Sequence, residues 1–458
     1  MKSTTTSRFA LALMAIALLL GISLSTTAVQ AQDMTDEQAL ERARADLIQL
    51  LSGDVEPLYA QLNAQMQAAL TAEALAQGMS TLSQQVGAYQ SELVSNVQTV
   101  QGYKSVTLTL QFEGAVLDFN ISYDSDGLIA GLFMRPSDYL PPGADVTAEY
   151  VDPSAFTETD VTVHSEDGFD IACTLAMPTN TDQPVPALTI MSGSGPQDRE
   201  GTLGPNKFYR DFAQGIASLG VAVLRCDDRT FTYGQDSIPE GENATVEHEF
   251  LRDARAAVAL LQQTDGINPD KVFVLGHSEG AYLVPRLLDS DPSIAGGIMA
   301  AGTITESLTA AAVRQITYLI NLDGTVTEAE QQVLDEAVAM DQAVQALTPE
   351  SDPTSMIGPF PVAYLLDLAS YDALAVAQAI PQPLLIIRGE RDYQVDQAGF
   401  DAWQTALADR PDTTFTQYPG LNHLFMVGEG APNGDEYALP NHVDAQVIAD
   451  IAAWVLAH

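Results

Sequence analysis

KVFVLGHSEGAYLVPRLL, residues 271–288, is the stretch that decides the fold of this 458-residue chain. An apolar run precedes the pentapeptide Gly276-His277-Ser278-Glu279-Gly280, and a segment with helical character follows it. Strand, sharp turn and helix in this order are the context in which a G-x-S-x-G motif presents a nucleophilic serine. The flanking glycines avoid clashes with the neighbouring strand and helix. A glycine-rich turn with a bystander serine is the alternative interpretation, since the chain holds 32 glycines.

Further apolar runs alternate with helical stretches on both sides of this motif. Strands separated by helices predict a parallel sheet with right-handed crossovers, whose chemistry lies at the carboxyl ends of the strands. Residues 303–378 are long, helical and without a clear strand, so we expect them to form a cap inserted above the sheet. The predicted strands are Ala187 to Met191, Val221 to Arg225, Val272 to Leu275, Gly296 to Ala300, Leu384 to Arg388 and Thr414 to Tyr418.

A nucleophilic serine needs a base, and in the expected chain order the base is a histidine that comes last. Three histidines follow Ser278, namely His423, His442 and His458. His423 lies in the loop just after the last strand, which places it at the catalytic edge of the sheet. His442 opens the final helix and His458 ends the chain, so we predict that His423 is the base.

The orienting acid is expected after the preceding strand, in the loop Gly389-Glu390-Arg391-Asp392. Glu390 and Asp396 compete with Asp392, and most loop carboxylates in so acidic a chain are surface charges. The position of Asp392 in the turn favours it as the acid of a Ser278, Asp392 and His423 triad.

An oxyanion hole requires two backbone N–H donors. One is expected from Glu279, the residue after the serine, and the other from the glycine-rich loop at residues 192–196, where we select Ser194. A plain turn is the alternative for that loop. The remaining histidines, His164, His248 and His277, have no pattern that indicates chemistry. Neither metal-ligand spacing nor a phosphate-binding loop is found, so no metal and no cofactor are predicted.

The charge balance excludes some classes of partner. The chain has 19 Lys and Arg against 61 Asp and Glu, a net charge of −42. Such a surface repels nucleic acid and anionic membranes, so neither a nucleic-acid nor a stable membrane partner is expected. The sequence leaves the oligomeric state open.

The first residues have the pattern of a secretory signal. Lys2 and Arg8 are followed by an apolar stretch, and Val29-Gln30-Ala31 offers small residues for cleavage near Ala31. We therefore expect residues 1–31 to be a signal peptide and the mature protein to be exported to the periplasm or the medium. An uncleaved membrane anchor is the alternative.

The pattern changes twice along the rest of the chain. Residues 34–86 have helical spacing, and three strands are expected next, at residues 105–110, 116–123 and 128–134. Residues 34–135 are thus a small α+β N-terminal domain. A proline-rich linker, residues 136–160, leads to the main domain at residues 161–458.

The two cysteines, Cys173 and Cys226, lie in or beside predicted strands. A cross-strand bridge is conceivable in an oxidising compartment. Because strand neighbours rarely have the geometry for a bridge, the sequence favours two buried free thiols.

Four motifs in this order resemble the α/β-hydrolase superfamily, especially bacterial carboxylesterases related to the prolyl-oligopeptidase and dienelactone-hydrolase branches. They are SGSGPQDRE at 192–200, GHSEGA at 276–281, PLLIIRGERDYQV at 383–395 and GLNHLF at 420–425. The resemblance implies an eight-stranded, mostly parallel sheet with an antiparallel first hairpin. It also implies Ser278 as nucleophile, Asp392 as acid and His423 as base. Residues 34–135 more faintly resemble a domain of unknown function often found ahead of such esterases, similar to the nuclear-transport-factor-like fold.

One segment departs from the family pattern. Where the family has Asp-Lys-Arg-Gly-x-Gly, this chain has Asp227-Asp228-Arg229-Thr230-Phe231, and we interpret Arg229 as a loop brace. The predicted activity is hydrolysis of small-molecule carboxylic esters through an acyl-enzyme on Ser278. A serine peptidase or acyltransferase with the same triad is the first alternative, and a non-enzymatic binding protein the second.

Overall fold

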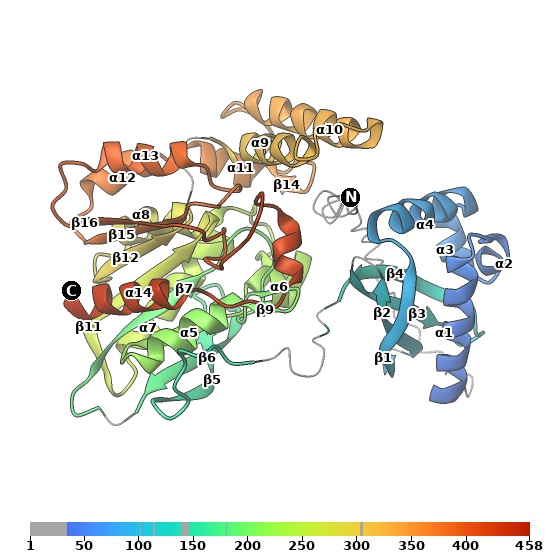
Figure 1. Ribbon diagram of the computed structural model, residues 1–458, viewed down its shortest axis with the longest axis horizontal. Coiled ribbons are helices and arrows are strands. Elements are labelled where there is room, and N and C mark those ends of the chain that lie inside the picture. The colour runs from blue at the N-terminus through green and yellow to red at the C-terminus, as the bar shows by residue number, and fades with distance from the viewer. Residues whose placement is uncertain are drawn as a thin grey trace. The chain divides into compact units, whose positions relative to one another are not determined.

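The structure is a computed structural model that describes residues 34–100, 102–112, 115–137, 139, 146–179, 181–302 and 306–458. The chain divides into two compact units, Met1–Pro141 and Pro142–His458 (Figure 1). The predicted signal peptide lies outside the described residues, as does the first part of the predicted cap. In the described ranges, no helix is long and apolar enough to cross a membrane.

The N-terminal unit is an antiparallel sheet with the strand order β1-β2-β3-β4 and a helical layer on one face. Its core joins Leu47 and Leu50 of helix α1 to Leu108 and Phe119 of the sheet. The elements are α1 (Asp36–Leu51), α2 (Glu56–Tyr59), α3 (Ala64–Ala69), α4 (Ala72–Val86), β1 (Tyr89–Val100), β2 (Tyr103–Phe112), β3 (Val116–Tyr123) and β4 (Ile129–Pro136).

Strand β1 is an addition to the three strands that the sequence predicts here. It is an edge strand that pairs only with β2, and its register shifts between Tyr89 and Ser91 and again between Glu92 and Val94. These irregularities interrupt the alternation of apolar and polar residues on which the sequence prediction depends.

The C-terminal unit is built on an eight-stranded sheet with the order β16-β15-β12-β11-β7-β10-β6-β5. Strand β6 runs antiparallel to β5 and β10, whereas all the other neighbouring pairs are parallel. The predicted mostly parallel sheet with an antiparallel first hairpin is therefore confirmed. The strands are β5 (Phe156–His164), β6 (Asp170–Pro178), β7 (Val185–Met191), β10 (Ala222–Cys226), β11 (Ile267–His277), β12 (Gly296–Ala300), β15 (Leu384–Gly389) and β16 (Thr413–Tyr418).

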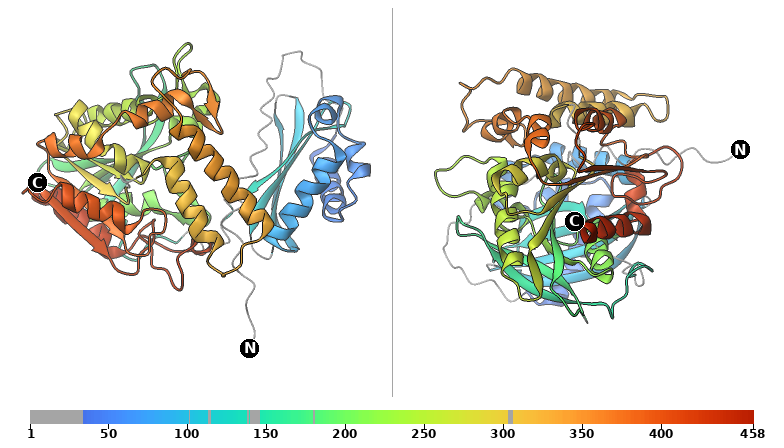
Figure 2. Two further views of the ribbon diagram at one scale, coloured as in Figure 1. Left: turned by 90° about the horizontal axis from the view of Figure 1, so that it is seen from above. Right: turned by 90° about the vertical axis from the view of Figure 1, so that its left-hand side faces the viewer.

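Helices cover both faces of this sheet (Figures 1 and 2). Along β11, Val272 and Val274 enter the core on one face, and Phe273 and Leu275 enter the core on the other. A strand buried on both faces explains the continuous apolar run before the serine motif. Helices α7 (Arg252–Gln262), α8 (Glu279–Ser290) and α13 (Gln397–Ala406) pack on the first face, and α5 (Phe208–Ser218) and α14 (Ala445–Ala457) on the second.

The described residues between β12 and β15 hold the helices of the predicted cap and its connection to the sheet. They also contain a short hairpin, with two residues in each strand, that the sequence does not predict. The elements are α9 (Leu308–Ile320), α10 (Glu328–Gln345), β13 (Met356–Ile357), β14 (Phe360–Pro361), α11 (Val362–Ala369) and α12 (Ala373–Ala379). The connecting elements elsewhere are β8 (Thr202–Leu203), β9 (Asn206–Lys207), α6 (Arg229–Tyr233), η1 (Gly234–Ser237), the π-helical turn η2 (Glu247–Leu251) and η3 (Gly434–Ala438).

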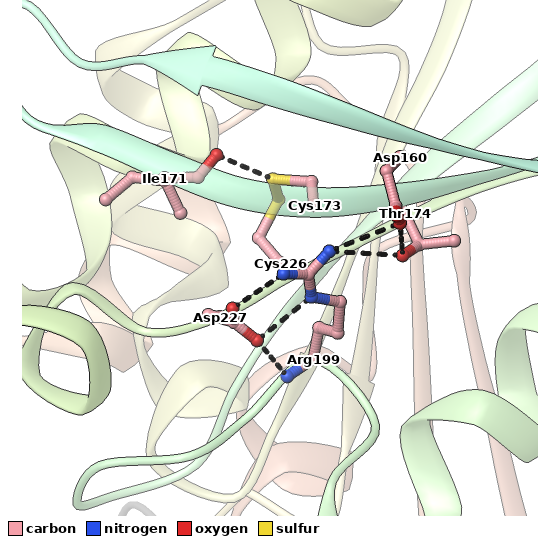
Figure 3. The surroundings of a disulfide bond; sticks show 7 residues. All are labelled: Asp160, Ile171, Cys173, Thr174, Arg199, Cys226 and Asp227. Carbon is pink, nitrogen blue, oxygen red and sulfur yellow. Dashed lines mark hydrogen bonds and ion pairs between the residues drawn. A yellow bond between two sulfur atoms is a disulfide. The ribbon is translucent and has the colours of Figure 1, made fainter. Parts of the chain in front are cut away.

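Cys173 and Cys226 form a disulfide, so the expectation of free thiols is wrong (Figure 3). The two residues are register partners on the antiparallel strands β6 and β10, and their Cα atoms lie 4.0 Å apart. The bridge closes a sequence separation of 53 residues and fixes the start of the loop that follows β10.

Removal of this bridge is expected to destabilise the protein. For a separation of 53 residues, loop-closure entropy gives a loss of about 4 kcal/mol in the free energy of unfolding for the double variant Cys173→Ala, Cys226→Ala. Urea unfolding measures the loss. A reducing agent is expected to lower the stability of the wild type toward that of the variant and to leave the variant unchanged. Two reactive thiols in unfolded, unreduced wild type would contradict the bridge.

Candidate active site

Ser278 lies on a strained turn between β11 and α8. Its φ of 54° and ψ of −115° are values that a non-glycine residue adopts only when its surroundings enforce them. A Cβ on Gly276 would lie 2.4 Å from the Gly280 carbonyl oxygen, and one on Gly280 would lie 2.3 Å from the Ser192 carbonyl oxygen. Both positions therefore require glycine, which is the physical basis of the motif.

Asp392 and His423 are brought together at the carboxyl ends of β15 and β16. The Nδ1 atom of His423 lies 2.7 Å from Oδ2 of Asp392, and both side chains are buried. The other carboxylate oxygen of Asp392 accepts the backbone N–H groups of Gln394 and Val395, at 2.8 and 2.9 Å. A carboxylate that only accepts requires the proton on Nδ1, which leaves Nε2 of His423 available as a base.

The competing residues have other partners. His442 lies beside Asp211, with 3.1 Å between Nδ1 and the carboxylate, and His458 bonds the carbonyl of Trp454. Asp396 is the N-cap of helix α13, and Glu390 is exposed. Of the residues weighed from the sequence, only Asp392 and His423 contact each other.

Ser278 is linked to His423 through its neighbour His277. The Nε2 atom of His277 lies 3.0 Å from the His423 carbonyl oxygen, and the two rings are 4.8 Å apart between centroids. In the described ranges, no hydrogen bond joins the hydroxyl of Ser278 to His423. In ligand-free hydrolases this bond is often long and tightens only when substrate binds.

The glycine-rich loop after β7 lies directly against Ser278. A Cβ on Gly193 would be 3.1 Å from the Cβ of Ser278. The N–H of Gly193 donates to the Tyr209 hydroxyl at 2.9 Å, so this amide is turned away from any oxyanion. The N–H of Ser194 follows it, and the N–H of Glu279 opens helix α8, where first-turn amides lack an intrahelical acceptor.

Two aspartates after the disulfide hold this loop from behind. Asp228 accepts the hydroxyl of Ser192 and the N–H of Gln197, and burial raises its pKa well above the usual range. Asp227 accepts the backbone N–H and the guanidinium of Arg199 (Figure 3). The bridge at Cys226 therefore anchors the segment that supports the glycine-rich loop at residues 192–196.

Arg229 occupies a buried position in this segment. Its guanidinium pairs with Asp167 and Asp253 and donates to the Ser165 hydroxyl. It also lies over the ring of Phe169, 4.8 Å from the centroid. These contacts make it a brace between the β5–β6 hairpin and helix α7.

The side chain of Glu279 is buried under the cap. The hydroxyl of Tyr364, from α11, donates to its Oε1 at 2.7 Å. Burial, which the Tyr364 hydrogen bond partly offsets and the nearby Glu249 carboxyl reinforces, raises the pKa of Glu279 to about 8. With this raised pKa, Glu279 is mostly neutral at pH 7 and places little negative charge beside Ser278.

Tyr209, Tyr364 and the contacts of His277 are not predicted from the sequence. Tyr209 and Tyr364 stand far from the motifs in sequence, and nothing in their local pattern indicates a role. Among the described residues, no group of three or more His, Cys, Asp or Glu side chains could hold a metal ion.

Comparison with known proteins identifies the family. A family model described as serine aminopeptidase, S33, matches residues 201–430, about half of the chain. The chain belongs to this family of α/β hydrolases. The resemblance inferred from the four motifs is thus confirmed, and the matched residues of the hydrolase include Ser278, Asp392 and His423. A second model, described as a protein of unknown function (DUF3887), matches residues 45–132.

The hydrolase is also similar to individual proteins. It is 30% identical to esterase EstD of Thermotoga maritima over 411 residues, which is 89% of this chain and 93% of that protein. Among solved structures, Est1E from Butyrivibrio proteoclasticus is 17% identical with a TM-score of 0.42, over 65% of this chain and 99% of that one. The Pyrococcus furiosus esterase Pf2001 is 15% identical with a TM-score of 0.43, over 66% and 91%.

The raised pKa of Glu279 predicts a pH-dependent stability. The pKa rises from 4.5 to about 8 on folding, so the folded protein binds the Glu279 proton more tightly than the unfolded chain does. The contribution of this proton to the free energy of unfolding is complete below pH 4.5 and is lost as the pH rises through about 8. In Glu279→Gln this loss, on the order of 4 kcal/mol, is expected to disappear. Urea unfolding at pH 5 to 9 measures it.

A matched control is Glu350→Gln, which changes an exposed glutamate in the same way. Its stability is expected to follow the wild-type pH curve. If Glu279→Gln also follows that curve, Glu279 is charged in the folded protein at neutral pH and the interpretation fails.

Proposed function

We propose that this chain is an exported serine esterase that cleaves small-molecule carboxylic esters through an acyl-enzyme on Ser278. The observation that carries the proposal is the buried pair of Asp392 and His423, at 2.7 Å, at the same sheet edge as the strained Ser278. The likeness to esterase EstD over most of both chains supports ester hydrolysis as the reaction.

The mechanism follows from the positions of these groups. His423 takes the proton of the Ser278 hydroxyl through Nε2, while Ser278 attacks the acyl carbon. The N–H groups of Ser194 and Glu279 hold the oxyanion of the tetrahedral intermediate. His423 then gives its proton to the departing alcohol oxygen, and water repeats the sequence to release the acid. Asp392 keeps the imidazole in the required tautomer throughout.

Peptide substrates are the second candidate, because the matching family model is described as a serine aminopeptidase. Esters and amides need the same nucleophile and oxyanion hole, so the triad does not discriminate between them. A panel that pairs p-nitrophenyl esters of increasing acyl length with aminoacyl p-nitroanilides separates the two. We expect turnover of the esters.

Export is supported by two independent features. The first residues have the pattern of a signal peptide with small residues before Gln32. The Cys173–Cys226 disulfide is typical of proteins that fold in an oxidising compartment. N-terminal sequencing of the secreted protein tests the proposal, which requires a mature chain that begins near Gln32.

Removal of the nucleophile tests the proposed function directly. In Ser278→Ala, kcat for a p-nitrophenyl ester is expected to fall by at least about 10⁴-fold, because no acyl-enzyme can form. A fluorophosphonate probe is expected to label the wild type and not the variant. Ser290→Ala, at the end of the same helix α8, is the matched control and is expected to keep both activities. Undiminished turnover by folded Ser278→Ala would overturn the assignment.

A further inference from the structure

Three buried hydrogen bonds connect the glycine-rich loop at residues 192–196, which we call the oxyanion loop, to the loop that carries the proposed base, His423. The Gly193 N–H donates to the Tyr209 hydroxyl at 2.9 Å, and this hydroxyl lies 3.5 Å from Nδ1 of His277. The Nε2 atom of His277 lies 3.0 Å from the carbonyl oxygen of His423. The series therefore starts beside Ser278 and ends on the backbone of the proposed base.

The direction of each hydrogen bond is fixed by chemistry. Burial raises the pKa of Tyr209 well above its usual value, so the hydroxyl keeps its proton. Burial lowers the pKa of His277 to about 3, so the imidazole is neutral and carries one proton. A carbonyl can only accept, which places that proton on Nε2 and leaves Nδ1 to accept from Tyr209. One arrangement of protons satisfies all three contacts.

The two ends of the series are the places where small displacements affect catalysis. Tyr209 holds the amide of Gly193, the residue directly before Ser194, whose N–H is the proposed oxyanion donor. At the other end, the His423 carbonyl sets the position of the ring whose Nδ1 meets Asp392. The distance between the proposed oxyanion donor, Ser194, and the proposed base, His423, therefore depends on Tyr209 and His277, which lie between them.

We propose that Tyr209 and His277 are positioning residues that hold the Ser194 oxyanion donor and the base His423 in register. The proposal rests on the proposed function. It adds two residues that do not touch the substrate and that act through the Gly193 amide and the His423 carbonyl. Helix α5 supplies Tyr209 and the end of β11 supplies His277, so together with the loops of Gly193 and His423 the brace involves four separate segments of the fold. The neighbouring ring of Phe208 packs against His277, with 5.0 Å between centroids.

Tyr209→Phe separates positioning from packing, because it keeps the ring and removes only the hydroxyl. We expect kcat for a p-nitrophenyl ester to fall about 10- to 100-fold with KM changed less than about threefold, since the lost contact acts on the transition state. Affinity for a trifluoromethyl ketone, which forms a tetrahedral adduct with a serine, is expected to fall by a similar factor.

Tyr123→Phe is the matched control. It removes another buried hydroxyl, bonded to Asp46 at 2.8 Å in the N-terminal unit, and is expected to leave kcat unchanged. If Tyr209 only fills space, Tyr209→Phe and Tyr123→Phe give the same kcat, and the proposal is overturned.

His277→Gln provides a second route to the same answer. If the two residues form one brace, Tyr209→Phe combined with His277→Gln loses no more activity than the more damaging single variant. Additive losses in kcat would overturn the brace. The value of kcat is calculated per molecule of enzyme that the fluorophosphonate probe labels, so that only folded enzyme is counted. A lower stability of one variant therefore does not affect this outcome. A wild type that neither turns over esters nor takes the probe rejects the proposed function, and the brace with it.

Discussion

The close approach of three backbone segments around Ser278 is the constraint on which the rest of this structure depends. Strand β11, helix α8 and the end of β7 meet so tightly that a single methyl group on Gly280 would overlap the Ser192 carbonyl. Ser278 has a positive φ within this turn, and the glycine-rich loop at residues 192–196 lies beside it. The proposed nucleophile and the loop proposed to hold the oxyanion therefore meet at one tightly packed place.

The chain carries a large negative charge, yet the groups around the turn at Ser278 are arranged to keep local negative charge low. Burial raises the pKa values of Glu279 and Asp228. Each has a hydroxyl partner, from Tyr364 and Ser192 respectively, that stabilises the buried group. The acidic composition therefore describes the solvated surface. Near Ser278, desolvation sets the charge state of these two buried carboxyl groups.

The sequence predicted those parts of the fold and site that local pattern determines, and missed those that depend on strand pairing. The strand, turn and helix around Ser278 follow from a continuous apolar run and two glycines. The position of Asp392 after a strand predicts it as the acid. The bridge between Cys173 and Cys226 was not predicted, because only the order β10 beside β6 makes them register partners. Likewise, Tyr209 reaches His277 only across the sheet face that α5 covers.

The helices between β12 and β15 contact the segments that hold Asp392 and Ser278. Arg314 of helix α9 donates to the carbonyls of Tyr393 and Gln394, at 2.9 and 2.8 Å, directly after the acid Asp392. Those same two residues begin the turn whose N–H groups hold the Asp392 carboxylate. From the other side, Tyr364 of α11 binds Glu279, the residue after Ser278. Because these helices contact both the turn that holds Asp392 and the residue next to Ser278, a substitution that moves them also acts on how these two side chains are held.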